Sequence, residues 1–426
     1  MIRTTALWRR VLLAAPMVIL ASLSAQQVMA ASVVVVGNCV PNSVHFTTIQ
    51  GAVDAVPSGS TIKICPANYP EQVVVNKNLT LTGVNSGTTD NPVLVIPSGG
   101  FVQNTASLTS GHPIAAQILV QSPATSVIIT KLAVDGSNSN LNGGCGDTRL
   151  IGIYYQNASG TVGFVTARNQ AQDAANFGCQ DSAGLGIFVQ SASPSTSTVT
   201  IQNSTVRGYQ KNGITGSEVG TTVTIANNSV VGAGPTTTGQ NGIEVGFGAT
   251  GNVRNNTVAD DDFNGDPTAG SGSGILIFDS GNMTITGNFV INVQNGIPIV
   301  TDGTLPADNH TVANNHVSNT HFGDGIDLCS NGNSVTGNVV FSSGQAGIHL
   351  DSSCGSTGNN NTVSKNTVNE ACAGILLGSG TGNTFPLPNL VANVANTTLA
   401  GDVCTPAGLS KKRVGSQGHI SSPARP

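Results

Sequence analysis

Charged residues are scarce in this sequence. Asp, Glu, Lys and Arg together make up 9% of its 426 residues, aromatic residues make up 4%, and there is one Trp. A globular domain usually carries about a quarter charged residues. The apolar fraction is nevertheless 38% and is regularly spaced, which excludes an intrinsically disordered chain. We therefore expect an architecture whose surface and corners consist of Gly, Asn, Ser and Thr.

Long apolar runs are also missing after the first 30 residues. Arg3, Arg9 and Arg10 precede an apolar run from Val11 to about Leu23, and small residues follow at 28–30. This is the pattern of a secretory signal peptide, which we assign to residues 1–30. The run is shorter than the about 20 residues of a membrane span, and no later segment offers one. The sequence predicts a secreted, periplasmic or cell-surface protein with no membrane span in the mature chain.

Basic residues are outnumbered by acidic ones, 16 to 21. Nucleic acid is therefore disfavoured as a partner, and an acidic polysaccharide would be repelled unless a cation bridged it. Several of the basic residues lie in the polar segment 406–426, among them Lys411, Lys412 and Arg413. We predict that this segment is a flexible tail.

A phrase containing Gly-Ile returns nine times. Its isoleucines are Ile153, Ile187, Ile214, Ile243, Ile275, Ile297, Ile326, Ile348 and Ile375, at intervals of 22 to 34 residues. A period that varies by insertion indicates a solenoid whose rungs carry loops of unequal length. These isoleucines are predicted to point into the solenoid.

A second phrase, apolar-x-x-Asn-x-apolar, alternates with the first. It occurs at Ile225–Val230, Val253–Val258, Ile285–Val290, Val312–Val317, Val335–Val340 and Val363–Val368, with Ser204 replacing Asn in Ile201–Val206. Alternating Val, Ile and Thr favour short strands, and Gly and Asn tolerate the left-handed backbone of tight corners. The fold class is therefore all-β, a parallel β-helix with two or three strands per rung. The repeated Asn is predicted to stack as a hydrogen-bonded ladder.

These repeats resemble the right-handed parallel β-helix superfamily that includes pectate lyases, polygalacturonases and pectin methylesterases. The resemblance covers roughly residues 45–385 and implies a right-handed coil, the pectin lyase fold. Within Thr47–Val56, an apolar stripe of Ile49, Ala52, Val53 and Val56 predicts a helix that caps the open end of the solenoid. We assign residues 31–60 to this cap and 61–405 to the β-helix, with its first strand at Thr61–Cys65.

Eight cysteines, an even number, favour disulfides in an exported chain. Cys329 and Cys354 are 25 residues apart, close to one rung, so they are expected to face each other. The same spacing argument pairs Cys39 with Cys65 and Cys145 with Cys179, and leaves Cys372 with Cys404. No CxxC is present, which disfavours a structural zinc site.

An acidic loop follows the strand phrase that ends at Val258. Asp260, Asp262, Asn264 and Gly265 match the first half of a calcium-binding loop, although the twelfth position is Ser271 instead of Glu. We predict calcium at Asp260, Asp262, Asn264 and Asp266; the alternative is a solvated acidic loop. Family lyases often use calcium to bind uronate carboxylates, so an occupied site would fit the resemblance.

A second group of polar residues is predicted by aligning the Gly-Ile phrases. Asp327 and His349 take the same position on consecutive rungs and are expected to point to solvent, with Asp351 on the same face and Asp324 at the preceding turn. Such a group suits acid–base chemistry on a glycosidic bond, and Asp324–Asp327 resembles one segment of the polygalacturonase active site. That family's adjacent Asp pair, Gly-His-Gly and Arg-x-Lys are missing here. A surface ladder without function is the alternative reading.

The remaining titratable residues receive simpler interpretations. Glu244 occupies the ladder position of Asp327 three rungs earlier and is expected to be solvated. His310 is placed in a polar loop, and His316 at an outward strand position. No Arg or Lys is placed in sequence to abstract a proton near the predicted carboxylates.

Two functions fit the sequence. The first is an exported hydrolase or lyase that binds or cleaves polysaccharide, with Asp324, Asp327, His349 and Asp351 as its catalytic residues and calcium as its cofactor. The second is a non-catalytic solenoid, such as an adhesin or a glycan-binding surface. A periplasmic metal-delivery protein is a poor fit, because the chain has only four Met and seven scattered His.

Overall fold

The computed structural model describes residues 30–84, 91–141, 148–172, 184–265, 270–401 and Cys404. The predicted signal peptide up to residue 29 and the predicted tail at 406–426 lie outside the described residues. The same holds for Cys145, Cys179 and Asp266. Predictions that involve these residues therefore stay predictions.

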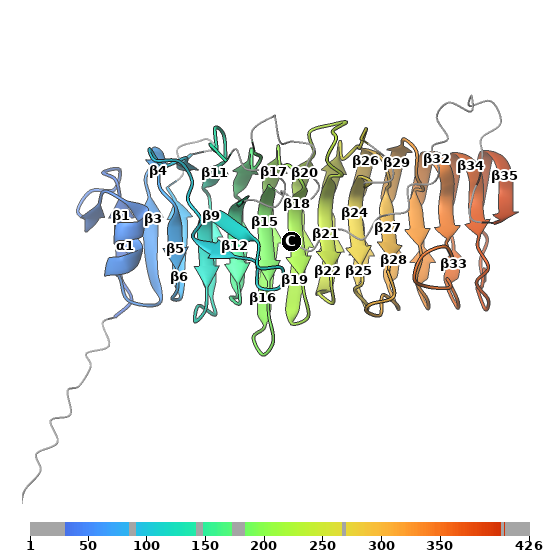
Figure 1. The fold of residues 1–426 in the computed structure, drawn as a ribbon, viewed down its shortest axis with the longest axis horizontal. Coiled ribbons are helices and arrows are strands. Elements are labelled where there is room, and N and C mark those ends of the chain that lie inside the picture. The colour runs from blue at the N-terminus through green and yellow to red at the C-terminus, as the bar shows by residue number, and fades with distance from the viewer. Residues whose placement is uncertain are drawn as a thin grey trace, which may run out of the picture. The chain divides into compact units, whose positions relative to one another are not determined.

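The chain coils into rungs of up to three short strands. One rung consists of β16 (Ser197–Gln202), β17 (Thr205–Arg207) and β18 (Asn212–Ser217). Successive rungs pair in parallel, and they stack in chain order, so the colours of Figure 1 run from blue to red along the stack. The structure is thus the parallel β-helix that the repeats predict.

The first face of the helix is a 13-stranded sheet. Its strands are β1 (Val33–Val36), β2 (His45–Phe46), β3 (Ser60–Ile64), β6 (Leu79–Gly83), β10 (Val127–Thr130), β13 (Gly160–Gly163), β16, β19 (Thr221–Ala226), β22 (Thr250–Arg254), β25 (Thr284–Thr286), β28 (Thr311–Ala313), β31 (Ser334–Thr336) and β33 (Thr362–Ser364).

The second and third faces are linked into one 22-stranded sheet. The second face holds β4 (Asn68–Pro70), β7 (Val93–Val95), β11 (Ala133–Asp135), β14 (Thr166–Arg168), β17, β20 (Ser229–Val231), β23 (Thr257–Ala259), β26 (Phe289–Val293) and β29 (His316–Thr320). The third face holds β5 (Val73–Val75), β9 (Pro113–Gln121), β12 (Arg149–Gln156), β15 (Leu185–Gln190), β18, β21 (Asn241–Gly246), β24 (Ser273–Phe278), β27 (Ile297–Val300) and β30 (Ile326–Leu328). Three longer strands, β32 (Val339–Leu350), β34 (Thr367–Leu377) and β35 (Leu390–Ala400), run through both faces. The short β8 (Thr105–Ala106) pairs antiparallel with β9.

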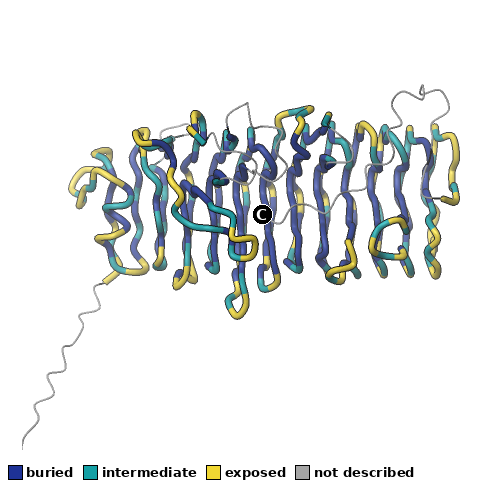
Figure 2. Tube along the Cα trace, in the orientation of Figure 1, coloured by how far each residue is buried: buried dark blue, intermediate teal, exposed yellow. Residues whose placement is uncertain are grey.

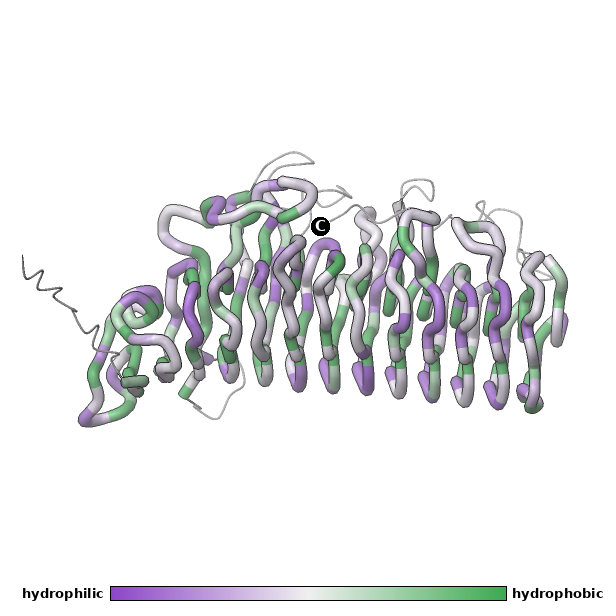
Figure 3. The backbone as a smooth tube through the Cα atoms, turned by 90° about the horizontal axis from the view of Figure 1, so that it is seen from below, coloured by the Kyte–Doolittle hydropathy of each residue, from purple (hydrophilic) through white to green (hydrophobic). Residues whose placement is uncertain are grey.

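The nine isoleucines of the Gly-Ile phrase lie in the interior, as predicted. All are buried and belong to one apolar core that extends from rung to rung. Within it Ile153 lies beside Ile187, and Ile297 beside Ile326. Buried segments follow the strands and exposed ones gather at the turns (Figure 2), and hydrophobic and hydrophilic residues alternate along the rungs (Figure 3).

The predicted Asn ladder runs through the corner between the first and second faces. Its members are Ser204, Asn228, Asn256, Asn288, Asn315, Asn338, Asn366 and Asn389, each bonded to the next. At every member except Asn389, the preceding residue turns the corner with a left-handed backbone, for example Asn227 at φ 58° and Asn314 at φ 55°. The ladder satisfies backbone groups that the turn takes out of the sheet.

The predicted capping helix is α1 (Ile49–Ala55), which begins after the N-cap Thr48. The Thr48 hydroxyl accepts a hydrogen bond from the Gly51 N–H at 3.1 Å, and the carboxylate of Glu71 accepts from the first N–H groups of the helix at 2.8 and 3.0 Å. The strand predicted at Thr61–Cys65 is present as β3, but it is not the first strand. The four valines 33–36 form β1 before the helix, and β1 pairs with β3.

Three disulfides join residues one rung apart or nearly so, and each was predicted. They are Cys39–Cys65, Cys329–Cys354 and Cys372–Cys404.

Among the described residues, no helix has the length and apolar character that a membrane span requires.

Candidate functional site

The candidate site lies on the outward side of the third face. The residue after each Gly-Ile points away from the interior, and these residues stack as Tyr154, Phe188, Thr215, Glu244, Leu276, Pro298, Asp327, His349 and Leu376. The predicted exposure of Glu244, Asp327 and His349 to solvent is wrong, since all nine residues of this column are buried. This outer face is covered, and its polar residues are enclosed together with apolar ones.

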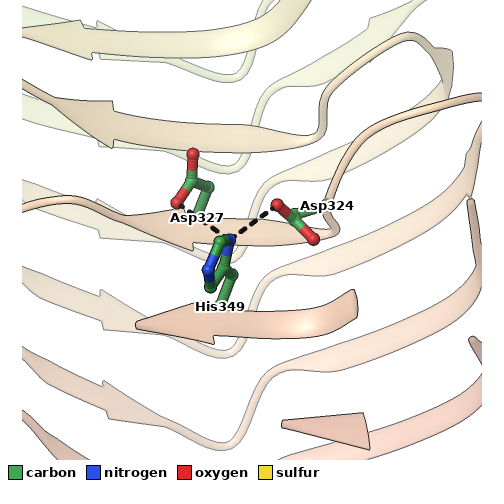
Figure 4. A group of neighbouring side chains, drawn as sticks. All are labelled: Asp324, Asp327 and His349. Carbon is green, nitrogen blue, oxygen red and sulfur yellow. Dashed lines mark hydrogen bonds and ion pairs between the residues drawn. The ribbon is translucent and has the colours of Figure 1, made fainter. Parts of the chain in front are cut away.

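Asp327 and His349 are register partners on β30 and β32, as predicted. His349 Nδ1 lies 3.0 Å from Asp324 Oδ2 and 3.8 Å from Asp327 Oδ1 (Figure 4). The second Asp324 oxygen accepts the N–H of Ala346 at 2.8 Å. Asp327 Oδ1 is buried and has no hydrogen-bond partner in the described part of the chain. The stacking of two rungs thus brings a histidine between two carboxyl groups.

Asp351 completes the group from the other side of the imidazole. Its Oδ1 lies 3.9 Å from His349 Nε2 and accepts hydrogen bonds from both the N–H and the hydroxyl of Ser353, each at 2.7 Å. All four predicted catalytic residues, Asp324, Asp327, His349 and Asp351, are therefore brought together. We call them the Asp327 cluster.

Burial and mutual repulsion make the ionisation of this cluster uneven. Burial, followed by the negative charge of Asp351, raises the pKa of Asp327 well above its ordinary value. Burial alone would lower the pKa of His349, but the carboxylates of Asp324, Asp327 and Asp351 outweigh it and raise that pKa to about 10. The cluster thus places an imidazolium beside a carboxyl group with a raised pKa, an arrangement suited to acid–base chemistry.

The same cluster has the composition of a cation site. Asp324, Asp327 and His349 each offer a ligand atom, and these atoms lie within 4.8 Å of one another. No other group of three or more His, Cys, Asp or Glu among the described residues comes as close. Because the raised pKa of His349 keeps a proton on both ring nitrogens, the imidazole would have to lose a proton before it could bind a metal ion.

The predicted calcium loop is only partly described. The carboxylate of Asp260 accepts from Asn292 Nδ2 at 3.4 Å, and Asp262 Oδ2 lies 2.8 Å from His321 Nδ1. Asn264 is exposed. Calcium at Asp260, Asp262, Asn264 and Asp266 stays a prediction.

Two residues are placed differently from their prediction. Glu244 is not solvated but 1% exposed, with Oε2 accepting from the amides of Asn212 and Asn241. His310 lies outside the strands, as predicted, but it is buried. Its Nδ1 accepts from the Met283 N–H, and burial lowers its pKa to about 4. The Asn-Gly-Ile repeat at 212 and 241 was the signal that could have located the partners of Glu244.

Comparison with known proteins agrees with this architecture. A family model described as a right-handed β-helix region matches residues 185–361. This match agrees with the right-handed parallel β-helix of the structure. No curated protein sequence matches the chain significantly.

Solved β-helix structures resemble the chain at low sequence identity. The A-module of the mannuronan C-5 epimerase AlgE4 from Azotobacter vinelandii is 14% identical, with a TM-score of 0.54 over 84% of this chain and 95% of its own. A GH136 lacto-N-biosidase from Eubacterium ramulus is 10% identical, with a TM-score of 0.59 over 85% and 68%. The pre-mature gene product 12 of bacteriophage phi29 is 14% identical, with a TM-score of 0.54 over 82% and 54%. At these identities the likeness shows the fold alone.

Proposed function

We propose that this protein is an exported carbohydrate-active β-helix that cleaves a neutral polysaccharide at the Asp327 cluster. The observation that carries the proposal is the contact between rungs: Asp327 beside His349, with Asp324 and Asp351 on either side. Elsewhere in the described chain no three such groups gather as closely. Two of the similar structures are named as enzymes of glycans, a mannuronan epimerase and a lacto-N-biosidase, which supports a carbohydrate substrate.

Each residue has a role in the proposed hydrolysis. Burial raises the pKa of Asp327, so Asp327 is the proposed acid, which donates its proton to the glycosidic oxygen as the C–O bond breaks. Asp351, which accepts two hydrogen bonds from Ser353, takes a proton from the attacking water, whose oxygen bonds to the anomeric carbon. The imidazolium of His349 stabilises the carboxylate that Asp327 becomes when it gives up its proton, and Asp324 orients His349. A lyase is the close alternative: the same base would remove a ring proton, and no water would be added.

A neutral glycan fits the charge of the site best. Three carboxyl groups surround one imidazole in the Asp327 cluster, and the whole chain carries a formal net charge of −5. A uronate polymer would be repelled unless calcium bridged it. This distinguishes the proposed substrate from mannuronan.

The test is to incubate the chain from residue 31 onward with neutral and uronate polysaccharides, with and without calcium. We expect new reducing ends from a neutral polymer, and Asp327→Asn should reduce the rate by at least about a hundredfold because the acid is lost. The matched control is Asp54→Asn on the exposed side of α1. Full activity in Asp327→Asn would show that the Asp327 cluster is not the catalytic site. An unsaturated product would identify a lyase.

A non-catalytic glycan-binding or adhesin-like solenoid is the second candidate. The near-complete burial of Asp327, 8% exposed, and His349, 2% exposed, favours it, because a reacting group needs access to substrate. Binding of a polysaccharide by the wild-type protein, without cleavage over a day, would support this reading.

A further inference from the structure

Glu244 forms a second polar centre on the outer side of the third face. Its Oε2 accepts from Asn212 Nδ2 at 2.7 Å and from Asn241 Nδ2 at 3.1 Å. Its Oε1 is buried and has no hydrogen-bond partner among the described residues. A buried carboxylate oxygen without a hydrogen-bond donor destabilises the fold.

Three hydroxyl groups around Glu244 share this property. Thr215 is the register partner of Glu244 on β18, Ser217 lies two residues further along the same strand, and Ser273 on β24 pairs with Asn241. Their hydroxyl oxygens are buried without a hydrogen-bond partner in the part of the chain that the structure describes. A buried hydroxyl group without a partner destabilises the fold. Four such buried atoms on adjoining rungs indicate a site whose partners are supplied from outside the protein.

The charges at this centre identify the kind of ligand. Lys211, whose Nζ donates to the Gly239 carbonyl at 2.7 Å, lies close enough to Glu244 for its positive charge to act on that carboxylate. The ammonium group disfavours a metal cation, and the carboxylate disfavours an anion. Hydroxyl groups of Thr and Ser both donate and accept. A neutral ligand rich in hydroxyl groups satisfies all four atoms.

The centre is aligned with the Asp327 cluster. Glu244, Leu276, Pro298 and Asp327 follow one another in the same outward column, which places Glu244 three rungs, or about 14 Å, from Asp327. The two apolar residues between them offer a surface of the kind that lines ligand sites between a few polar groups. A chain molecule lying across the rungs would contact both centres.

We propose that Glu244, Thr215, Ser217 and Ser273 bind one neutral sugar unit of a glycan whose scissile bond lies at the Asp327 cluster. This proposal rests on the proposed function, and it adds that the glycan runs across the rungs and that the sugar at Glu244 is uncharged. The four atoms are closed off from solvent in this structure, so the outer face has to open for binding. We therefore expect association slower than about 10⁵ M⁻¹ s⁻¹, the lower end of the usual range.

The experiment measures oligosaccharide binding in the Asp327→Asn background, where turnover is blocked. Neutral hexasaccharides from cellulose, mannan and xylan, and an oligogalacturonate of equal length, are titrated by calorimetry. At least one neutral hexasaccharide should bind. Adding Glu244→Gln should weaken its affinity at least tenfold and adding Thr215→Val several-fold, while adding Glu370→Gln at an exposed position should change nothing. Unchanged affinity in both test variants, or preferential binding of the uronate, would overturn the proposal.

Substrate length separates this proposal from the proposed function. In otherwise wild-type protein, Glu244→Gln should lower kcat/KM for hexasaccharides at least tenfold and leave it unchanged for disaccharides, which cannot reach both centres. Cleavage with equal loss at both lengths, or with no loss, overturns the sugar site and leaves the proposed function standing. Glu244-dependent binding without any cleavage by the wild-type protein overturns the function and leaves the site standing.

Discussion

His349 Nδ1 lies 3.0 Å from Asp324 Oδ2, although the two residues are 25 positions apart. Because His349 carries a proton on both ring nitrogens at neutral pH, Nδ1 donates and the carboxylate accepts. The other Asp324 oxygen accepts the N–H of Ala346, so one carboxylate ties the turn before β30 to β32. Asp324 therefore positions His349 between the two rungs.

The first prediction concerns stability above neutral pH. The pKa of His349 rises from about 6.5 in the unfolded chain to about 10 in the fold. Its stabilising contribution is fully present below pH 6.5 and is lost as the pH rises towards 10. The raised pKa of Asp327 acts in the same direction, because the fold prefers the protonated carboxyl group. The melting temperature of wild type should fall more steeply between pH 6.5 and 10 than that of His349→Gln; parallel curves would contradict this.

A second prediction concerns a carboxyl group enclosed near the core. Asp261 is buried and accepts from the Tyr209 hydroxyl at 2.5 Å. Burial raises the pKa of Asp261 well above its ordinary value. A raised pKa in the fold means that stability decreases as the pH rises from about 4 through the folded pKa.

Asp261→Asn should remove that decrease, because an amide of the same size cannot ionise. At pH 7 we expect the variant to be as stable as wild type or more stable, by denaturant titration. Asp54→Asn at the exposed helix position serves as the control. A loss of more than about 2 kcal/mol in Asp261→Asn would show that the carboxylate itself is required.

The Asn ladder gives a third prediction. Asn315 donates to the Ile285 carbonyl and to Asn338 Oδ1, at 2.9 and 3.0 Å, and accepts from the N–H and the amide of Asn288, at 3.0 and 2.9 Å. Asn315→Ala leaves these buried groups without partners and should cost roughly 2–4 kcal/mol. Asn252→Ala on an exposed strand position should cost under about 1 kcal/mol. An equal loss of stability in the two variants would mean that the ladder is dispensable.

The sequence predicted the parts of the structure that repeat. Most rungs repeat the same inward isoleucine and the same corner Asn, so the alignment of two phrases was enough to place Asp327 beside His349. Cys329 and Cys354 were predicted on the same ground. A solenoid makes such predictions possible because neighbours in space are one repeat apart in sequence.

Contacts between residues more than one repeat apart, and the burial of outward residues, could not be predicted from the repeat. His321 pairs with Asp262 across 59 residues, and Tyr209 pairs with Asp261 across 52, intervals that span more than one rung. The burial of Glu244 depends on whatever covers the outer face, and an outward position in a strand pattern says nothing about that cover. Strand alternation predicts the direction of a side chain but not its exposure.

Calcium binding at the acidic loop is the fourth prediction. Clustered carboxylates repel each other, and a divalent ion with oxygen ligands relieves that repulsion. Millimolar calcium should raise the melting temperature of the wild type, and Asp260→Asn should abolish the rise. Magnesium serves as the control ion, because its smaller octahedral shell does not suit this loop. If calorimetry detects no heat of calcium binding, the prediction is wrong.

The last prediction comes from the corner before the Asn ladder. Lys365 occupies this corner with a left-handed backbone, φ 59°, where other rungs place Gly287 at 65° and Gly337 at 69°. A residue with a Cβ pays about 1–2 kcal/mol in this conformation, whereas Gly does not. Lys365 is exposed, so its replacement removes no packing.

Lys365→Gly should therefore stabilise the protein by up to about 1 kcal/mol, after the larger conformational entropy of Gly in the unfolded chain is subtracted. The reciprocal variant is Gly337→Ala, whose new Cβ would lie 2.5 Å from Asn314 Oδ1 and which should destabilise by more than about 1 kcal/mol. Denaturant titration measures the free energy of unfolding of both variants. If Lys365→Gly is less stable than wild type, the lysine side chain and not backbone strain determines the stability of this corner.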